Sequence, residues 1–333
     1  MPSADSTAAT LQSIQTAAVS VKLLHAMPWF GIMEVMKRAC WTSVIRIAGA
    51  AVLAISAVWC AGYDAVSNTT VAVTRTAPRE VVLSWWNGAT PCHARITAPA
   101  EHSVGALDWS RDASEQLIVV WELRARDDAE SDVYAQLFRA DGEPAWAADG
   151  VVVNAFRGRQ TAPRVVASPH DGYYVVWQSD SAGVNNENIW CQRLRADGTP
   201  AWPAPAAVCT HAGNQVQPVL AADPDGGALI AWVDYRNGNA DVFGQRVEAD
   251  GAPLLTEDGV AIEVAPGDQI NVQFLLNGQS GMRIAWDDVR PERHVPVRVE
   301  TDISRLPIPE PGLGVWLTMG TLSLVRRTTR RVD

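Results

Sequence analysis

The sequence predicts an all-β protein built from tandem repeats. The first observation is a regular spacing of tryptophans, each following a short β-branched or apolar run, with steps of 56, 55 and 54 residues: Trp121, Trp177, Trp232 and Trp286. Two further landmarks keep this spacing, a glutamine (Gln136, Gln192, Gln245) and an Asp-Gly turn (Asp141-Gly142, Asp197-Gly198, Asp250-Gly251). No helical period competes between residues 64 and 306, so the repeat unit consists of strands.

Each unit contains four predicted strands. In the second unit the β-rich runs and their turns are 163–168, a turn at Asp171-Gly172, 173–178, 189–195, a turn at Asp197-Gly198, and 206–210. Four antiparallel strands in a unit of about 50 residues are typical of a β-propeller blade. We therefore expect a β-propeller of four or five blades, with a signal helix before it and a short hydrophobic helix after it. An open β-solenoid or a stack of sandwiches is the alternative.

The repeated tryptophan has a structural interpretation. A large aromatic side chain at one fixed place in every unit supplies much buried area, so we expect Trp121, Trp177, Trp232 and Trp286 to pack between blades and not to stack on a ligand. The units also resemble a bacterial secreted repeat, with residues 232–246 (WVDYRNGNADVFGQR) as the closest copy. The resemblance covers residues 104–301. It implies an extracellular propeller without known chemistry.

The number of blades depends on the two ends of the array. Three complete units begin near Leu107, Pro163 and Pro218, and a fourth from Val272 lacks its last strand. Within residues 63–103, the strand-like runs 80–86 and 92–97 supply either the missing strand, which would close the ring, or a degenerate extra blade. Closure would remove an open sheet edge.

The N-terminal part carries a predicted export signal. A basic segment at 36–46 precedes 13 apolar residues at 47–59, which are too few for an ordinary membrane span. We interpret residues 36–62 as a signal peptide that is cleaved after Gly62. A lipoprotein site at Cys60 is the alternative. Residues 1–35 are expected to be a disordered leader or to lie upstream of a true start at Met33 or Met36.

The C-terminal part has three segments. After a linker at 302–308, residues 309–333 comprise Pro309-Glu310-Pro311, an uncharged stretch at 312–325, and a basic tail that begins with Arg326 and Arg327. This order resembles the PEP-CTERM sorting signal of Gram-negative bacteria. The resemblance implies transient anchoring in the inner membrane, processing by an exosortase, and delivery to the cell surface or extracellular matrix. A plain membrane anchor is the alternative.

The charge distribution excludes one class of partner. The net charge is −10, but residues 63–309 contain 33 acidic side chains, 19 arginines and no lysine, a net charge of −14. A segment with this excess of acidic side chains does not bind the phosphate backbone of a nucleic acid through counterion release. We therefore expect no nucleic-acid partner.

Two clusters are candidates for special chemistry. Cys191 and Cys209 lie on the third and fourth strands of one unit and form either a disulfide or two separate buried thiols. The oxygen-rich loop after Trp232, with Asp234, Asn237, Asn239 and Asp241, could bind calcium, the one cofactor that the sequence suggests. The alternative is a solvated turn in which Arg236 forms an ion pair with Asp234, and Arg290 can do the same in the last unit.

No catalytic motif stands out. The segment from Ser168 to Gly172 loosely resembles the repeated motif of sialidases, but its position favours a hairpin turn. The sequence therefore predicts an exported protein that is not an enzyme, a binding or structural module for exopolysaccharide or envelope glycans. The alternative is a secreted glycan-active propeller enzyme that resembles sialidases or lyases.

Overall fold

The computed structural model describes residues 58–63, 70–181, 183, 185–277, 281–290, 292 and 296–302. All of them belong to one compact unit, residues 56–333. The predicted leader at 1–35 and the sorting signal at 309–333 lie outside the described residues. The predicted signal peptide is described only at 58–62, and the linker only at Asp302. No helix in this part of the chain is long and apolar enough to cross a membrane.

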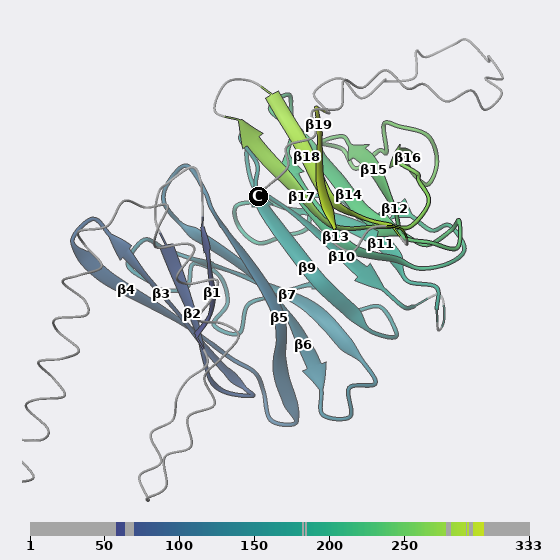
Figure 1. The fold of residues 1–333 in the computed structure, drawn as a ribbon. Coiled ribbons are helices and arrows are strands. Elements are labelled where there is room, and N and C mark those ends of the chain that lie inside the picture. Colours follow the sequence, from purple (N-terminus) through teal and green to yellow (C-terminus); the bar gives the residue numbers. More distant parts are fainter. Residues whose placement is uncertain are drawn as a thin grey trace, which may run out of the picture. The chain divides into compact units, whose positions relative to one another are not determined.

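The described chain forms five antiparallel sheets (Figure 1). The first contains β1 (Val58–Tyr63), β2 (Thr70–Ala77), β3 (Glu80–Asn87) and β4 (Thr90–Thr97). The second contains β5 (His102–Arg111), β6 (Leu117–Ala125), β7 (Ser131–Phe138) and β8 (Val151–Asn154). The third contains β9 (Gln160–Ala167), β10 (Tyr173–Ser179), β11 (Asn188–Leu194) and β12 (Ala206–Cys209). The fourth contains β13 (Gln215–Ala222), β14 (Ala228–Asp234), β15 (Asp241–Val247) and β16 (Val260–Glu263), and the fifth contains β17 (Asp268–Asn277), β18 (Gly281–Val289) and β19 (Val297–Asp302).

These sheets are the blades of a β-propeller, as the repeat predicts. Strands that follow one another in the chain are neighbours in each sheet, and every pair is antiparallel. The runs at 80–86 and 92–97 fall in β3 and β4 of the first sheet, so they form the extra blade. No strand of the first sheet pairs with the last sheet among the described residues, so the structure does not contain the predicted closing strand. Residues 58–62 lie in β1, and cleavage after Gly62 would remove most of that strand.

The core lies between neighbouring sheets. Trp177, on β10, packs in one apolar cluster with Ile118 and Val120 of β6 in the preceding sheet. Trp232 and Trp286 occupy the same place in the clusters that join the third sheet to the fourth and the fourth to the fifth. All three tryptophans are at most 1% exposed. Because burial of an apolar surface stabilises by about 25 cal/mol per Å², these rings hold adjacent blades together.

The tryptophans require small residues beside them. Gly259 has a φ of +83°, and a Cβ there would lie 2.5 Å from Cη2 of Trp232 and 2.7 Å from the carbonyl oxygen of Gly244. Only glycine combines this backbone conformation with such a close approach. The short link before β16 therefore packs directly on the ring.

The repeated glutamine supports the chain between the third and fourth strands of a blade. The Gln245 side-chain amide donates to the carbonyl of Thr256 at 2.8 Å, and its oxygen accepts from the backbone N–H of Leu255 at 2.8 Å. Gln136 accepts in the same way from the N–H of Trp146 at 3.1 Å. This glutamine thus adds hydrogen bonds to the backbone of a link that pairs with the third strand only through an isolated bridge.

We expect Gly259→Ala to lower the free energy of unfolding by about 2–5 kcal/mol, because the methyl group combines left-handed strain with overpacking against Trp232. Urea denaturation monitored by tryptophan fluorescence measures this change. Gly238→Ala is the matched control, since Gly238 has a φ of +92° with nothing within 4 Å of the added Cβ. It should cost only about 1–2 kcal/mol. Equal costs for the two variants would contradict the packing argument.

Candidate functional site

A cavity of ≈ 840 Å³ opens between the second and third sheets. Its walls are the β5–β6 turn and the β7–β8 link of one blade, and the β9–β10 and β11–β12 turns of the next. The chemically distinctive side chains in its lining are three carboxylates, a histidine and two aromatics: Asp112, Asp171, Asp197, His170, Trp146 and Tyr173.

One wall of the cavity contains a repeat position, Leu137, whose side chain is shorter than its equivalent in the third sheet. Leu137 of β7 lies opposite Ile118 of β6. The register of the third sheet places Arg193 opposite Tyr174 at the same two positions. Leu137 lines the cavity and Ile118 is fully buried beside it in the sheet, and both are shorter than Arg193 and Tyr174.

The longer side chains lie at the junction between the third and fourth sheets. The guanidinium of Arg193 lies 5.7 Å from the centre of the Tyr174 ring and donates to the carbonyl of Ala249 in the fourth sheet. Arg246 occupies the equivalent position in the fourth sheet and forms a 2.5 Å ion pair with Asp223. The repeat thus places an arginine at this point in the third and fourth sheets and a leucine in the second.

Asp112 is held in one orientation at the wall of the cavity. The Tyr173 hydroxyl donates to its Oδ2 at 2.8 Å, and the N–H groups of Ser114 and Gln116 donate to its Oδ1 at 2.8 and 3.0 Å. Burial and the hydrogen bond to Asp112 raise the pKa of Tyr173, so its hydroxyl stays protonated and continues to donate.

Trp146 forms a rigid aromatic wall. Its Nε1 donates to the carbonyl of Ala196 at 2.9 Å, and its ring packs against Gly198, where a Cβ would lie 2.8 Å from Cδ2. The ring meets Tyr173 edge to face, with centroids 6.1 Å apart. Trp146 is only half-buried, so part of the ring faces the cavity.

The remaining polar groups differ in how they are held. Hydrogen bonds from the Thr199 hydroxyl and N–H lower the pKa of Asp197, which therefore stays ionised. His170 donates from Nε2 to the carbonyl of Pro224 at 3.2 Å. The Asp171 carboxylate is exposed and has no hydrogen-bond or ion-pair partner in the described part of the chain.

The segment with the sialidase-like residues is a hairpin turn. The Ser168 N–H donates to the Gly172 carbonyl at 2.9 Å, and β9 and β10 pair on either side of it. This turn nevertheless carries Asp171 into the cavity. Sequence reasoning missed the site, although one signal was present: Leu137 stands where the repeat has arginine in the next two units.

The predicted calcium residues satisfy one another. Asp234 accepts from Trp232 Nε1 at 2.8 Å and forms a 2.7 Å ion pair with Arg236. Asn237 and Asn239 both donate their amide N–H groups to Asp241, at 2.8 and 3.0 Å. Donors therefore surround both carboxylates. Within the described ranges, no group of three His, Cys, Asp or Glu side chains is arranged to hold a metal ion.

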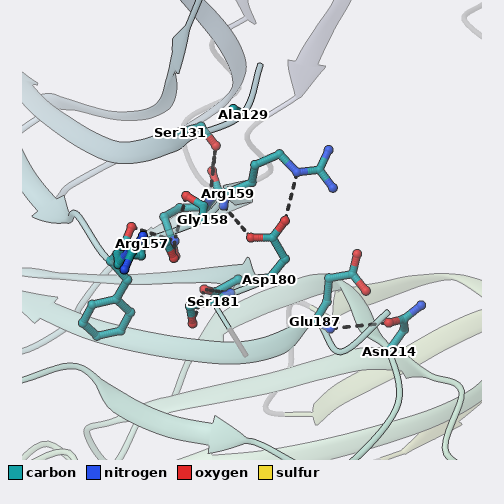
Figure 2. A network of polar contacts seen from close by, with 12 residues as sticks. Ala129, Ser131, Arg157, Gly158, Arg159, Asp180, Ser181, Glu187 and Asn214 are labelled. Carbon is teal, nitrogen blue, oxygen red and sulfur yellow. Dashed lines mark hydrogen bonds and ion pairs between the residues drawn. The ribbon is translucent and has the colours of Figure 1, made fainter. Parts of the chain in front are cut away.

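In other loops, too, acidic side chains pair with arginines and so connect neighbouring strands. Figure 2 shows Asp180, after β10, accepting from Nε of Arg159, just before β9, at 3.0 Å. Beside it, the Ser131 hydroxyl at the start of β7 donates to the Gln160 carbonyl at 2.8 Å. In the last sheet Arg290 pairs with Asp288 at 2.9 Å. These contacts serve the fold.

Comparison with known proteins gives matches only at the level of structure. The sequence matches no protein-family model, and no curated protein shows significant similarity to it. An endo-arabinase from Bacteroides thetaiotaomicron aligns at 9% identity and a TM-score of 0.45, over 73% of this chain and 92% of that one. A thermostable family-43 glycoside hydrolase aligns at 8% identity and a TM-score of 0.44, over 74% and 92%. The polysaccharide lyase Uly1 aligns at 10% identity and a TM-score of 0.47, over 80% and 74%.

These neighbours correct one prediction. The sequence led us to expect a protein that is not an enzyme, whereas the similar structures are glycoside hydrolases and polysaccharide lyases. That expectation is not retained. Because the identities and TM-scores are low, an activity has to be argued from the residues of this chain.

The cysteines do not form the predicted disulfide. Cys191 lies opposite Ala206 and Cys209 opposite Ile189, with an irregularity in the register between Ile189 and Trp190. Both are free and buried. Burial raises the pKa of both thiols, that of Cys209 to about 12. With the register that pairs Cys191 with Ala206, Cys209 would fall opposite Asn188, and the irregularity moves it only one position closer, to Ile189. The two thiols therefore remain offset along the strands.

We expect thiol titration to distinguish the two arrangements. In a chain with Cys40 and Cys60 replaced by serine, Ellman's reagent without reductant should react with three thiols after denaturation, and with only one if the disulfide formed. In the folded protein, Cys191 and Cys209 should react slowly at pH 8. Their contribution to stability is complete below the unfolded thiol pKa of about 8.5 and is lost as the pH rises toward 12.

Proposed function

We propose that this protein is an exported glycan-active enzyme and that a saccharide binds in the cavity between the second and third sheets. The observation that carries the proposal is the combination of a half-exposed tryptophan ring with three carboxylates around one cavity of ≈ 840 Å³. The ring can pack on the C–H face of a sugar, while the carboxylates accept hydrogen bonds from its hydroxyl groups. A few oriented polar groups beside aromatic walls are typical of small-molecule sites.

Two of the carboxylates have the unequal environments that glycoside cleavage requires. Asp112 is fixed by the Tyr173 hydroxyl and two backbone N–H groups, so it can orient a substrate or stabilise positive charge on the sugar. Asp171, whose carboxylate has no hydrogen-bond or ion-pair partner within the described ranges, is the proposed general acid or base. In this proposal Asp171 is the catalytic residue and Tyr173 positions Asp112.

A screen of polysaccharides for reducing ends and for unsaturated products tests the proposal. Leu137→Arg should abolish binding and turnover, because the arginine fills the cavity as Arg193 fills the next junction. The fold should persist, since the repeat itself carries arginine at this position twice. Leu137→Met, which conserves the volume, is the matched control and should retain activity.

Asp171→Asn should lower kcat about 10²–10⁴-fold on any substrate that the screen identifies, because the amide cannot transfer a proton. Circular dichroism should show an unchanged fold. Turnover that survives both Leu137→Arg and Asp171→Asn would rule out this cavity as the active site.

The proposed route to the cell surface rests on the two terminal signals of the sequence. Deletion of the exosortase gene should leave the C-terminal segment from Pro309 uncut and keep the protein in the inner membrane. Cell fractionation with intact-mass measurement in both strains checks this. The same unprocessed C-terminus in wild-type and deleted strains would refute the sorting proposal and leave the cavity proposal untouched.

A further inference from the structure

We infer that the cavity selects saccharides that carry a protonated amino group, that is, hexosamine units without an N-acetyl group. This inference rests on the proposed function and names its substrate class. The first observation is the charge of the lining, which contains Asp112, Asp171 and Asp197 but no arginine or lysine.

The second observation is the contrast with the next two blades, where the repeat places a cation at the position of Leu137. Arg246 lies within 2.5 Å of Asp223 and within 3.9 Å of Asp225, in the turn equivalent to the one that carries Asp112. Arg193 lies against the Tyr174 ring. With Leu137 at this position, no guanidinium faces Asp112 as Arg246 faces Asp223, whereas Asp171 lies in the turn to which Arg193 donates, at its backbone carbonyl, at 2.9 Å. A bound ammonium group would restore that missing charge.

The third observation is that the hydrogen bonds to Asp112 and Asp197 come from neutral donors, with Arg195, which lies outside the lining, as a further favourable charge near Asp197. Asp112 accepts three hydrogen bonds from neutral donors, and Asp197 accepts two from Thr199. These contacts orient the carboxylates and leave their charge in place. His170, the one titratable nitrogen in the lining, has its Nε2 turned to the carbonyl of Pro224.

Trp146 adds to the same preference. A cation within about 6 Å of an indole ring is attracted to its face, and an amino sugar that stacks on the exposed part of Trp146 brings its ammonium group into that range. Uronic acids and sulfated sugars need the opposite lining, in which arginine or lysine pairs with their anionic groups. The net charge of −14 over residues 63–309 also disfavours the approach of such polymers.

The test compares three oligosaccharides of equal length by titration calorimetry: a glucosamine oligomer, its N-acetylated form, and a galacturonic acid oligomer. We expect the glucosamine oligomer to bind at least tenfold more tightly than the N-acetylated form, and the galacturonic acid oligomer not to bind. Raising the salt from 50 to 300 mM should weaken the first interaction and leave the second within about twofold. Asp197→Asn should lower the ratio of the two affinities about three- to tenfold, because asparagine can still accept from Thr199 while it removes one charge.

The outcomes separate this inference from the proposed function. If the N-acetylated or galacturonic acid oligomer binds as tightly as the glucosamine oligomer, and Leu137→Arg abolishes that binding, the amino-sugar inference is wrong and the cavity remains a glycan site. If no oligomer binds, the amino-sugar inference is wrong, and the polysaccharide screen alone decides the proposed function. If Leu137→Arg has no effect on binding, both proposals fail. A lysine oligomer of equal charge that binds as tightly would show that the cavity recognises charge and not a saccharide, which also overturns the inference.

Discussion

Packing between neighbouring sheets is the interaction on which the rest of this protein depends. A single four-stranded sheet has two faces and cannot bury either by itself, so each blade is stabilised by the next. Trp177, Trp232 and Trp286 lie in clusters that join two successive sheets, and the small residues beside them follow from the size of the indole ring. The repeat period near 55 residues is therefore the length of chain that forms one sheet and reaches the tryptophan of the next sheet.

The same repetition makes local departures informative. Several acidic side chains of the loops pair with arginines or amides, as in Asp234 with Arg236 and Asp180 with Arg159, and these contacts connect strands. At one junction the sequence replaces arginine with Leu137, and the cavity lining there contains three carboxylates and no arginine or lysine. In a repeat protein, a position that breaks the pattern and leaves charge unbalanced is a better guide to function than a position that keeps it. Positions that keep the pattern support those that break it. Two repeated residues, Gln136 and Gly198, hold the Trp146 ring at the edge of the cavity.

Much of the fold could be predicted because its signals are local and repeated. The β-rich runs, the Asp-Gly turns and the spacing of the tryptophans predict the strands of the second, third and fourth sheets, and the hairpin at Ser168–Gly172 follows from its residues. For residues 80–97 the sequence left two possibilities, a closing strand or an extra blade. Strands that pair with partners far away in the chain carry no local sequence signal of that pairing, so the sequence could not choose between them. The cysteine pair shows the same limit at small scale: equal distances from an assumed turn centre suggest a bridge, but the hairpin pairs Cys191 with Ala206 and Cys209 with Ile189, so the thiols are offset.

By itself, the sequence determined the class of fold, the repeat unit, its landmark residues and the acidic character of the body, since these depend on composition and on spacing along the chain. Only the tertiary structure decided which side chains face one another across a junction. That is why the loop with Asp234 and Asp241, prominent in the sequence, proved to be internally satisfied, while Asp112, Asp171, Asp197 and Trp146 came together from four separate turns. A cavity is a property of the space between two sheets, and its lining here comes from turns and links of both sheets, with Leu137 in its wall.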